Sequence, residues 1–136
     1  IPEPGESSAS RHAPETRDAR LAACAASPDF SYPPPDASAY GLSGDDQAWV
    51  NRRQTRHPGR CYIAPLQFES AVVSGVTRTF VDCTSPPLAT IDVSRKRVRD
   101  PGFWGAPWRI VEIATGHDPM VSAPHDLAQV LLECAR

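Results

Sequence analysis

The chain lacks long apolar runs, a strong net charge and paired cysteine motifs. Its 136 residues carry 14 Lys and Arg against 16 Asp and Glu, a formal net charge of −2. This balance gives no electrostatic reason to expect nucleic acid or an anionic membrane as a partner. No apolar run approaches the ~20 residues that a membrane-spanning helix needs. We therefore expect a soluble protein whose partners include neither nucleic acid nor a membrane.

The four cysteines are scattered and form no Cys-x-x-Cys pair, which argues against a zinc ribbon and against a compact disulfide framework. Isolated cysteines of this kind are often small buried apolar residues, and free thiols are typical of the cytoplasm. His57 and Cys61 have a spacing that could bind a metal on a helix, but Pro58 and Gly59 between them argue against one. We expect a cytoplasmic protein with reduced thiols, no metal and no cofactor.

The first part of the chain has weak periodicity and much of the proline. It begins at Ile1 without the basic start or apolar core of a signal peptide, so we expect a cut end or an internal start. Helices are predicted from Glu15 to Ala26 and from Asp45 to Arg56. Between them, Pro33-Pro34-Pro35 excludes regular helix or a central strand. We interpret residues 1–59 as a helical region with Pro-rich loops.

From residue 60 the pattern alternates between short extended segments and helices, over Cys61 to Ile63, Thr77 to Cys83, Leu88 to Arg99, Arg109 to Ile113, and a closing helix that begins near Ser122. Connections of this length imply parallel strands joined by right-handed crossovers. The predicted fold class is α/β. The basic run Arg95-Lys96-Arg97 with Arg99 is interpreted as a solvated helix face rather than as a nucleic-acid patch.

The loop after the last predicted strand, Thr115-Gly116-His117-Asp118-Pro119-Met120, is the strongest functional signal. A β-branched run followed by Gly and His is typical of a strand that delivers an imidazole to the end of a sheet. A plainer interpretation is a loop histidine that caps the following helix or binds a carbonyl group. Asp118 is interpreted as fixing the loop, because adjacent loop residues generally point apart.

Taken in order, three segments make the chain resemble small α/β-hydrolases of the branch that contains plant methyl esterases and hydroxynitrile lyases: Trp49-Val50-Asn51-Arg52-Arg53, Thr79-Phe80-Val81-Asp82-Cys83 and Gly116-His117-Asp118-Pro119-Met120. The resemblance implies that the chain is the C-terminal half of such a fold. Residues 1–59 would be the helical cap, and residues 60–136 the last core strands and helices. The chain contains no Gly-x-Ser-x-Gly motif. The resemblance therefore implies an N-terminal half, missing or separate, that carries the nucleophilic serine and the oxyanion donors.

In this setting His117 would be the general base that takes the proton of the serine hydroxyl. The orienting acid of the resembled enzymes usually follows the earlier strand in a Cys-x-x-Asp pattern, but that position holds Pro86. Asp92 and Asp82 are the nearest alternatives, and Glu69 is a third. An acid from the N-terminal half and a dyad without an acid also stay open.

The resemblance implies an esterase that acts on a small carboxylic ester. Trp49 and Met120 are expected to line the substrate pocket, although aromatic residues in such a region are more often part of its core. The alternative is a noncatalytic α/β-hydrolase remnant that binds a small ligand or a protein partner. Pro86 and the absent serine motif favour this alternative.

Overall fold

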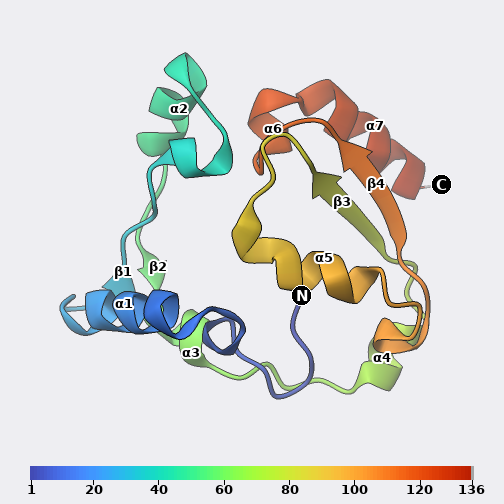
Figure 1. The fold of residues 1–136 in the computed structure, drawn as a ribbon, viewed down its shortest axis with the longest axis horizontal. Coiled ribbons are helices and arrows are strands. Elements are labelled where there is room, and N and C mark those ends of the chain that lie inside the picture. Colours follow the sequence, from blue (N-terminus) through green and yellow to red (C-terminus); the bar gives the residue numbers. More distant parts are fainter. Residues whose placement is uncertain (136) are drawn as a thin grey trace.

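The computed structural model describes residues 1–135, apart from the side chains of Ser70 and Ser74. Figure 1 shows an α/β unit formed by the later part of the chain, beside an N-terminal region of short helices and a small β-ribbon. None of the helices in the described part of the chain is long and apolar enough to cross a membrane.

The α/β unit is built on two parallel strands, β3 (Thr79–Cys83) and β4 (Arg109–Ile113). Both are rich in β-branched residues, which favour extended structure. The connection between them contains the helix α5 (Asp92–Val98). The prediction of parallel strands joined through a helix is therefore confirmed.

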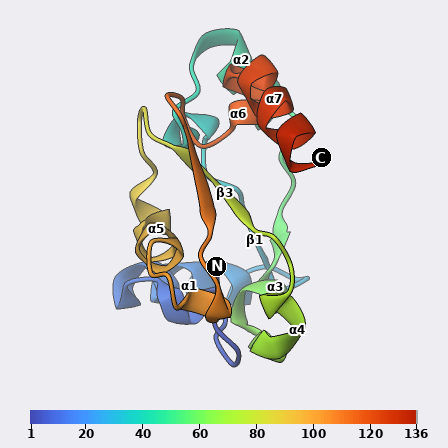
Figure 2. The same ribbon diagram turned by 90° about the vertical axis from the view of Figure 1, so that its right-hand side faces the viewer.

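Helices cover both faces of this small sheet. Thr79 and Asp82 lie an odd number of residues apart on β3, so their side chains point to opposite faces. Arg95 of α5 binds Asp82 on one face, and Cys134 donates a 3.4 Å hydrogen bond to Thr79 Oγ1 on the other. Cys134 ends the helix α7 (Pro124–Cys134). Figure 2 accordingly shows α5 and α7 on opposite sides of the two strands.

The outer edge of β3 is open. The amide of Thr84 donates to the carbonyl of Ile113, so Thr84 and every second residue before it turn their backbone groups toward β4. The amides and carbonyls of Thr79 and Val81 therefore face away from β4. Within residues 1–135 no third strand joins this sheet, which leaves it too small to identify a hydrolase fold.

The N-terminal region is a succession of short elements: η1 (Ala9–Arg11), α1 (Pro14–Ala25), β1 (Ser31–Tyr32), η2 (Ala37–Tyr40), α2 (Gly44–Asn51), β2 (His57–Pro58), α3 (Gly59–Ile63) and α4 (Ser70–Ser74). β1 and β2 pair antiparallel. The predicted helix from Glu15 to Ala26 matches α1 within one residue at each end.

A small apolar cluster joins this region to the α/β unit. Ala37, Leu42 and Val50 are buried together, and Tyr40 and Val121 pack against them. Val121 lies on the short helix α6 (Pro119–Ser122), directly after the histidine loop. The cluster therefore holds α2 and η2 against the end of the sheet from which that loop emerges.

Two local predictions were wrong. Cys61 to Ile63 is not extended but lies in α3, because Tyr62 is buried against the N-terminal elements and stacks edge-on with Tyr32 at 5.6 Å between ring centroids. The second helix ends at Asn51 instead of Arg56.

The interpretation of the basic run as a solvated face was wrong for Arg95 and Arg97, whereas Lys96 and Arg99 are exposed. The side chains of Arg95 and Arg97 are only 12% and 19% exposed. Arg97 forms a two-pronged ion pair with Glu6, with N–O distances of 2.5 and 2.7 Å. Arg95 points onto the sheet because β3 presents the buried carboxylate of Asp82 to α5. Lys96 is exposed, as predicted.

Candidate functional site

Three segments meet at the carboxyl ends of β3 and β4. The amide of His117 donates a 2.8 Å hydrogen bond to the carbonyl of Tyr40 at the end of η2. Gly116 lies so close to Gly41 that an added Cβ would lie 3.1 Å from the Gly41 Cα and would collide with the Tyr40 carbonyl oxygen. A Cβ at Gly41, where φ is +84°, would lie 2.8 Å from Cδ of Pro86. Glycines thus allow the loops after both strands to contact η2.

Hydrogen bonds hold the histidine loop in place. Ser85, after β3, donates its amide to the carbonyl of Thr115 at 3.0 Å. The hydroxyl groups of Thr115 and Ser122 lie 2.5 Å apart, and Ser122 also donates to the carbonyl of Asp118 at 3.2 Å. Pro119 starts α6, a position where its missing amide costs no helical hydrogen bond. The backbone around His117 is therefore fixed on both sides.

The imidazole of His117 is partly exposed, and its ring centroid lies 5.9 Å from that of Tyr40. Among residues 1–135, no side chain or backbone group makes a hydrogen bond or ion pair with this imidazole. Both ring nitrogens are thus left without a partner within the described chain. An imidazole at the carboxyl end of a parallel strand occupies the edge where ligands of open α/β sheets bind.

The structure does not bring either predicted acid into contact with His117. Asp82 is 2% exposed and is held by Arg95 at 2.7 Å and by Arg99 at 2.8 Å. Asp92 is largely exposed and forms an ion pair with Arg95. The third alternative, Glu69, is an exposed residue just before α4. The carboxylates of Asp82 and Asp92 are therefore paired with arginines of α5 and its C-terminal end. The position that the resemblance assigns to the acid holds Pro86.

The electrostatics of Asp82 follow from these contacts. Burial alone would raise the pKa of this carboxyl, but hydrogen bonds from Arg95 and Arg99 outweigh it and lower the pKa. The Asp82 side chain is thus held in its ionised form and balances the positive charges of Arg95 and Arg99. Nearer the loop, burial raises the pKa of the Tyr40 hydroxyl, and the neighbouring charge of Asp118 raises it further.

Trp49 and Met120, the two predicted substrate-binding residues, line one cavity of about 420 Å³ between α2 and α6. Both side chains are substantially exposed, and the guanidinium of Arg53 lies 4.4 Å from the Trp49 ring centroid. The remaining lining residues are Asp45, Asp46, Arg52 and Val121. The cavity combines apolar walls with a charged rim and lies beside the helix that follows His117. The imidazole itself is not among its lining residues.

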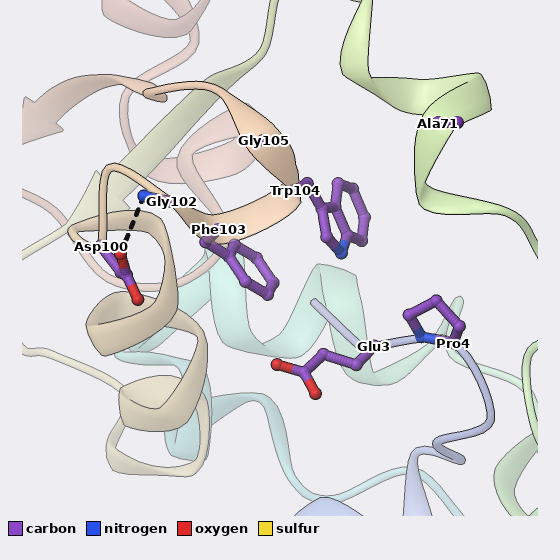
Figure 3. Close-up of a pocket in the computed structure, with 8 residues that line it drawn as sticks. All are labelled: Glu3, Pro4, Ala71, Asp100, Gly102, Phe103, Trp104 and Gly105. Carbon is purple, nitrogen blue, oxygen red and sulfur yellow. Dashed lines mark hydrogen bonds between the residues drawn. The ribbon is translucent and has the colours of Figure 1, made fainter.

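A larger cavity, of about 460 Å³, lies near α4 and the 3-10 helix η4 (Phe103–Gly105), toward the other end of the strands. Figure 3 shows the Phe103 and Trp104 rings facing it from one side and Glu3 and Pro4 lying across from them. Trp104 has a φ of +60°, and its indole N–H is buried without a hydrogen-bond partner. Sequence reasoning missed this cavity, although the aromatic run after Pro101-Gly102 was visible.

No group of three or more His, Cys, Asp or Glu side chains able to hold a metal ion occurs in the part of the chain that the structure describes. Comparison with known proteins adds no family assignment: no protein-family model, no curated protein and no solved structure matches this chain.

Proposed function

We propose that this chain is the histidine-bearing part of an α/β-hydrolase-type esterase that acts on small carboxylic esters. His117 is the general base, and the nucleophilic serine belongs to an N-terminal half, either a preceding segment or a second chain. One observation carries the proposal: His117 lies on a pinned loop at the carboxyl end of β4 with both imidazole nitrogens unpartnered among residues 1–135. The open edge of β3 supports an N-terminal half that adds a further strand.

The proposed reaction has two proton transfers at the imidazole in each of its two halves, acylation and deacylation of the serine. The serine oxygen bonds to the ester carbonyl carbon while His117 takes the hydroxyl proton. The protonated imidazole then gives that proton to the leaving alcohol oxygen as the ester bond breaks. Water then attacks the acyl-serine while His117 takes a proton from it, and the imidazole returns that proton to the serine oxygen as the acyl bond breaks and the carboxylic acid leaves. The hydrogen bond from the His117 amide to Tyr40 and the contacts of Thr115 hold the loop backbone that carries the imidazole.

The cavity between Trp49 and Met120 suits the apolar part of a small ester. No carboxylate among the described residues orients the imidazole, so the proposed base works as a serine–histidine dyad or with an acid from the N-terminal half. His117 alone has a role in proton transfer within this chain.

The test begins with the native material. Intact mass and size-exclusion chromatography show whether a second polypeptide accompanies the 14.8 kDa chain. Hydrolysis of p-nitrophenyl acetate and butyrate is then compared among the unmodified protein, His117→Ala and His125→Ala. His125 is an exposed residue on α7 and serves as the matched control.

We expect His117→Ala to abolish turnover, His125→Ala to retain it, and added imidazole to restore part of the activity of His117→Ala. Native material that consists of a lone, folded and inert 14.8 kDa chain, with neither a preceding segment nor a second polypeptide, would overturn the proposal. Turnover that is insensitive to His117→Ala would overturn it as well.

The second candidate is a noncatalytic remnant that binds a small ligand or a protein partner. Pro86 favours it, because this residue stands at the edge of the sheet where the resembled enzymes carry an acid. Such a protein would bind small esters without hydrolysing them, even when an N-terminal half is present. Ligand binding measured beside turnover in the same preparation separates the two candidates.

A further inference from the structure

We propose that a separate cavity in the N-terminal region binds a small organic carboxylate. The cavity has a volume of about 250 Å³ and lies between the N-terminal elements and the start of α5. Its principal lining residues are two arginines, two tyrosines and two aliphatic residues: Arg11, Arg20, Tyr32, Tyr40, Ile91 and Val93. It shares no lining residue with the cavity between Trp49 and Met120.

Arg11 supplies the first argument. Its guanidinium makes no hydrogen bond or ion pair with any residue in the described range 1–135, and its Nε–H is shielded from solvent without a partner. A buried donor left without an acceptor is costly, and native structures rarely keep one without a purpose. The terminal nitrogens of Arg11 also have no partner in this range but are not shielded from solvent, so they are the donors that this lining residue can offer to a ligand oxygen in the cavity.

Arg20 supplies the second cation. Its guanidinium lies over the rings of Tyr32 and Tyr62, at 5.6 and 5.4 Å from their centroids. One of its nitrogens lies 3.1 Å from Nε2 of His12. Burial and the charges of Arg20 and Arg11 lower the pKa of His12, so its imidazole stays neutral and accepts from Arg20. Arg20 is thus held by the two tyrosine rings and by the His12 imidazole rather than by an acid.

The cavity therefore has two positive charges and no carboxylate among the described residues that line it. Glu6, whose pKa the charge of Arg11 helps to lower, is already bound by both terminal nitrogens of Arg97. A guanidinium group binds a carboxylate through paired N–H donors. An anionic ligand is thus the chemistry that completes the site.

The other walls select the rest of the ligand. Pro35, Ile91 and Val93 are apolar, and Tyr32 and Tyr40 contribute aromatic rings. A bare inorganic anion would leave these walls facing water, whereas an aromatic or branched carboxylic acid would cover them. The volume, below the roughly 300–1,000 Å³ of drug-sized sites, restricts the ligand to a small acid.

Tyr40 connects this cavity with the histidine loop, because the same residue lines the cavity and accepts the hydrogen bond from the His117 amide. A ligand in the cavity would thus contact Tyr40, the residue whose carbonyl binds the His117 amide. Binding of a carboxylate does not depend on ester hydrolysis, so the two proposals can fail separately.

The test is calorimetric titration of the 136-residue chain with phenylacetate. Phenylacetamide is the neutral analogue of the same shape, and inorganic phosphate is the anion without an apolar body. We expect phenylacetate to bind at least tenfold more tightly than either, and Arg11→Gln and Arg20→Gln each to weaken it at least tenfold. Arg17→Gln is the control and should leave the affinity unchanged, because Arg17 lies on α1 with Arg20 but is paired with Asp18.

Arg11→Gln removes no hydrogen bond within the described chain, so it tests the proposal even if Arg20→Gln disturbs folding; circular dichroism reports that disturbance. Equal affinity for the acid and the amide would overturn the proposal. Binding of phosphate as tight as that of phenylacetate, no change in Arg11→Gln, or no binding of phenylacetate would also overturn it.

Discussion

The amide of His117 and the carbonyl of Tyr40 form a 2.8 Å hydrogen bond that ties the N-terminal region to the end of the α/β unit. The bond exists because Gly116 has no side chain. An added Cβ there would meet the Tyr40 carbonyl and the Gly41 backbone, which are both main-chain atoms that cannot rotate away as a flexible side chain could. The position of the imidazole therefore depends on a glycine beside it.

Replacing Gly116 with alanine should disrupt this contact. Overpacking against main-chain atoms costs about 1–3 kcal/mol, so the free energy of unfolding of Gly116→Ala should fall by about that amount in urea denaturation. Gly75→Ala is the control, because nothing lies within 4 Å of an added Cβ there. It should change stability by less than about 1 kcal/mol. Equal stability of the two variants would contradict the tight crossing at Gly116.

The carboxylate of Asp82 should be essential to the packing of α5. In Asp82→Asn, Arg95 and Arg99 lose their shared negative partner in a buried position. Breaking a buried ion pair from one side costs about 3–5 kcal/mol. Asp92→Asn is the control, since the Asp92 side chain is 59% exposed and its pair with Arg95 is a surface pair. Thermal unfolding that ranks the two variants equally would show that Asp82 contributes no more than a surface charge.

Acid should destabilise the protein through Glu6. The hydrogen bond from Arg97 is the main cause that lowers the pKa of Glu6 from 4.5 to about 2. A lowered pKa in the folded state contributes stability above the unfolded value, and this contribution is lost as the pH falls through the folded value. The free energy of unfolding should therefore decline between pH 4.5 and about 2.

Glu6→Gln should be less stable than the unmodified protein at pH 7 and should lose less stability on acidification. Chemical denaturation at several pH values measures both effects. Parallel pH profiles for the two proteins would show that the ion pair with Arg97 does not persist in solution.

Local sequence patterns predict the strand Arg109–Ile113 but not the conformation of Cys61 to Ile63. Arg109–Ile113 was predicted with its observed bounds because a β-branched run follows a proline and precedes a glycine loop. Cys61 to Ile63 was too short for periodicity to distinguish a strand from a turn of helix. Its conformation is decided by distant contacts, since the buried Tyr62 packs against β1 and the Gly59 amide donates to the carbonyl of Phe30.

At the site too, local sequence pattern predicts some features, whereas distant contacts decide others. Sequence predicted that His117 follows a strand, and the structure places it there. Sequence could not predict the pairing of Arg95 with Asp82, because it requires knowing which face of β3 meets α5. It also missed the cavity at Arg11 and Arg20, since residues 1–14 have no periodicity that would place them against α1 and α5. Their location results from long-range contacts such as that between Glu6 and Arg97.

The four cysteines should differ in reactivity according to their burial. Cys61 and Cys134 are exposed, whereas Cys24 and Cys83 are buried, and burial raises the pKa of the Cys83 thiol. Because the thiolate is the reactive form, iodoacetamide should modify the first two rapidly and the second two only on unfolding. Peptide mass spectrometry after brief labelling of the native protein measures this. Rapid labelling of Cys24 would contradict its packing beside Gly59 and Phe30.

The pKa of the His12 imidazole should depend on the positive charges of Arg20 and Arg11. Burial is the largest cause that lowers its pKa below 6.5, and the charges of Arg20 and Arg11 add to it. Because the lowered pKa belongs to the folded state, the stability contributed by neutral His12 is present above pH 6.5 and is lost as the pH falls through the folded value. Titration of the ring carbon–proton signals by NMR should therefore give a midpoint below 6.5.

Removing one of these cations should raise the midpoint of His12, because one nearby positive charge then no longer opposes protonation. Arg20→Gln should shift it upward, while Arg17→Gln, whose side chain is paired with Asp18 on the same helix, should not. A bound carboxylate between Arg11 and Arg20 should act in the same direction, since a negative charge favours the protonated ring. A midpoint at or above 6.5 in the unmodified protein would show that the burial of His12 beside the charges of Arg20 and Arg11 does not persist in solution.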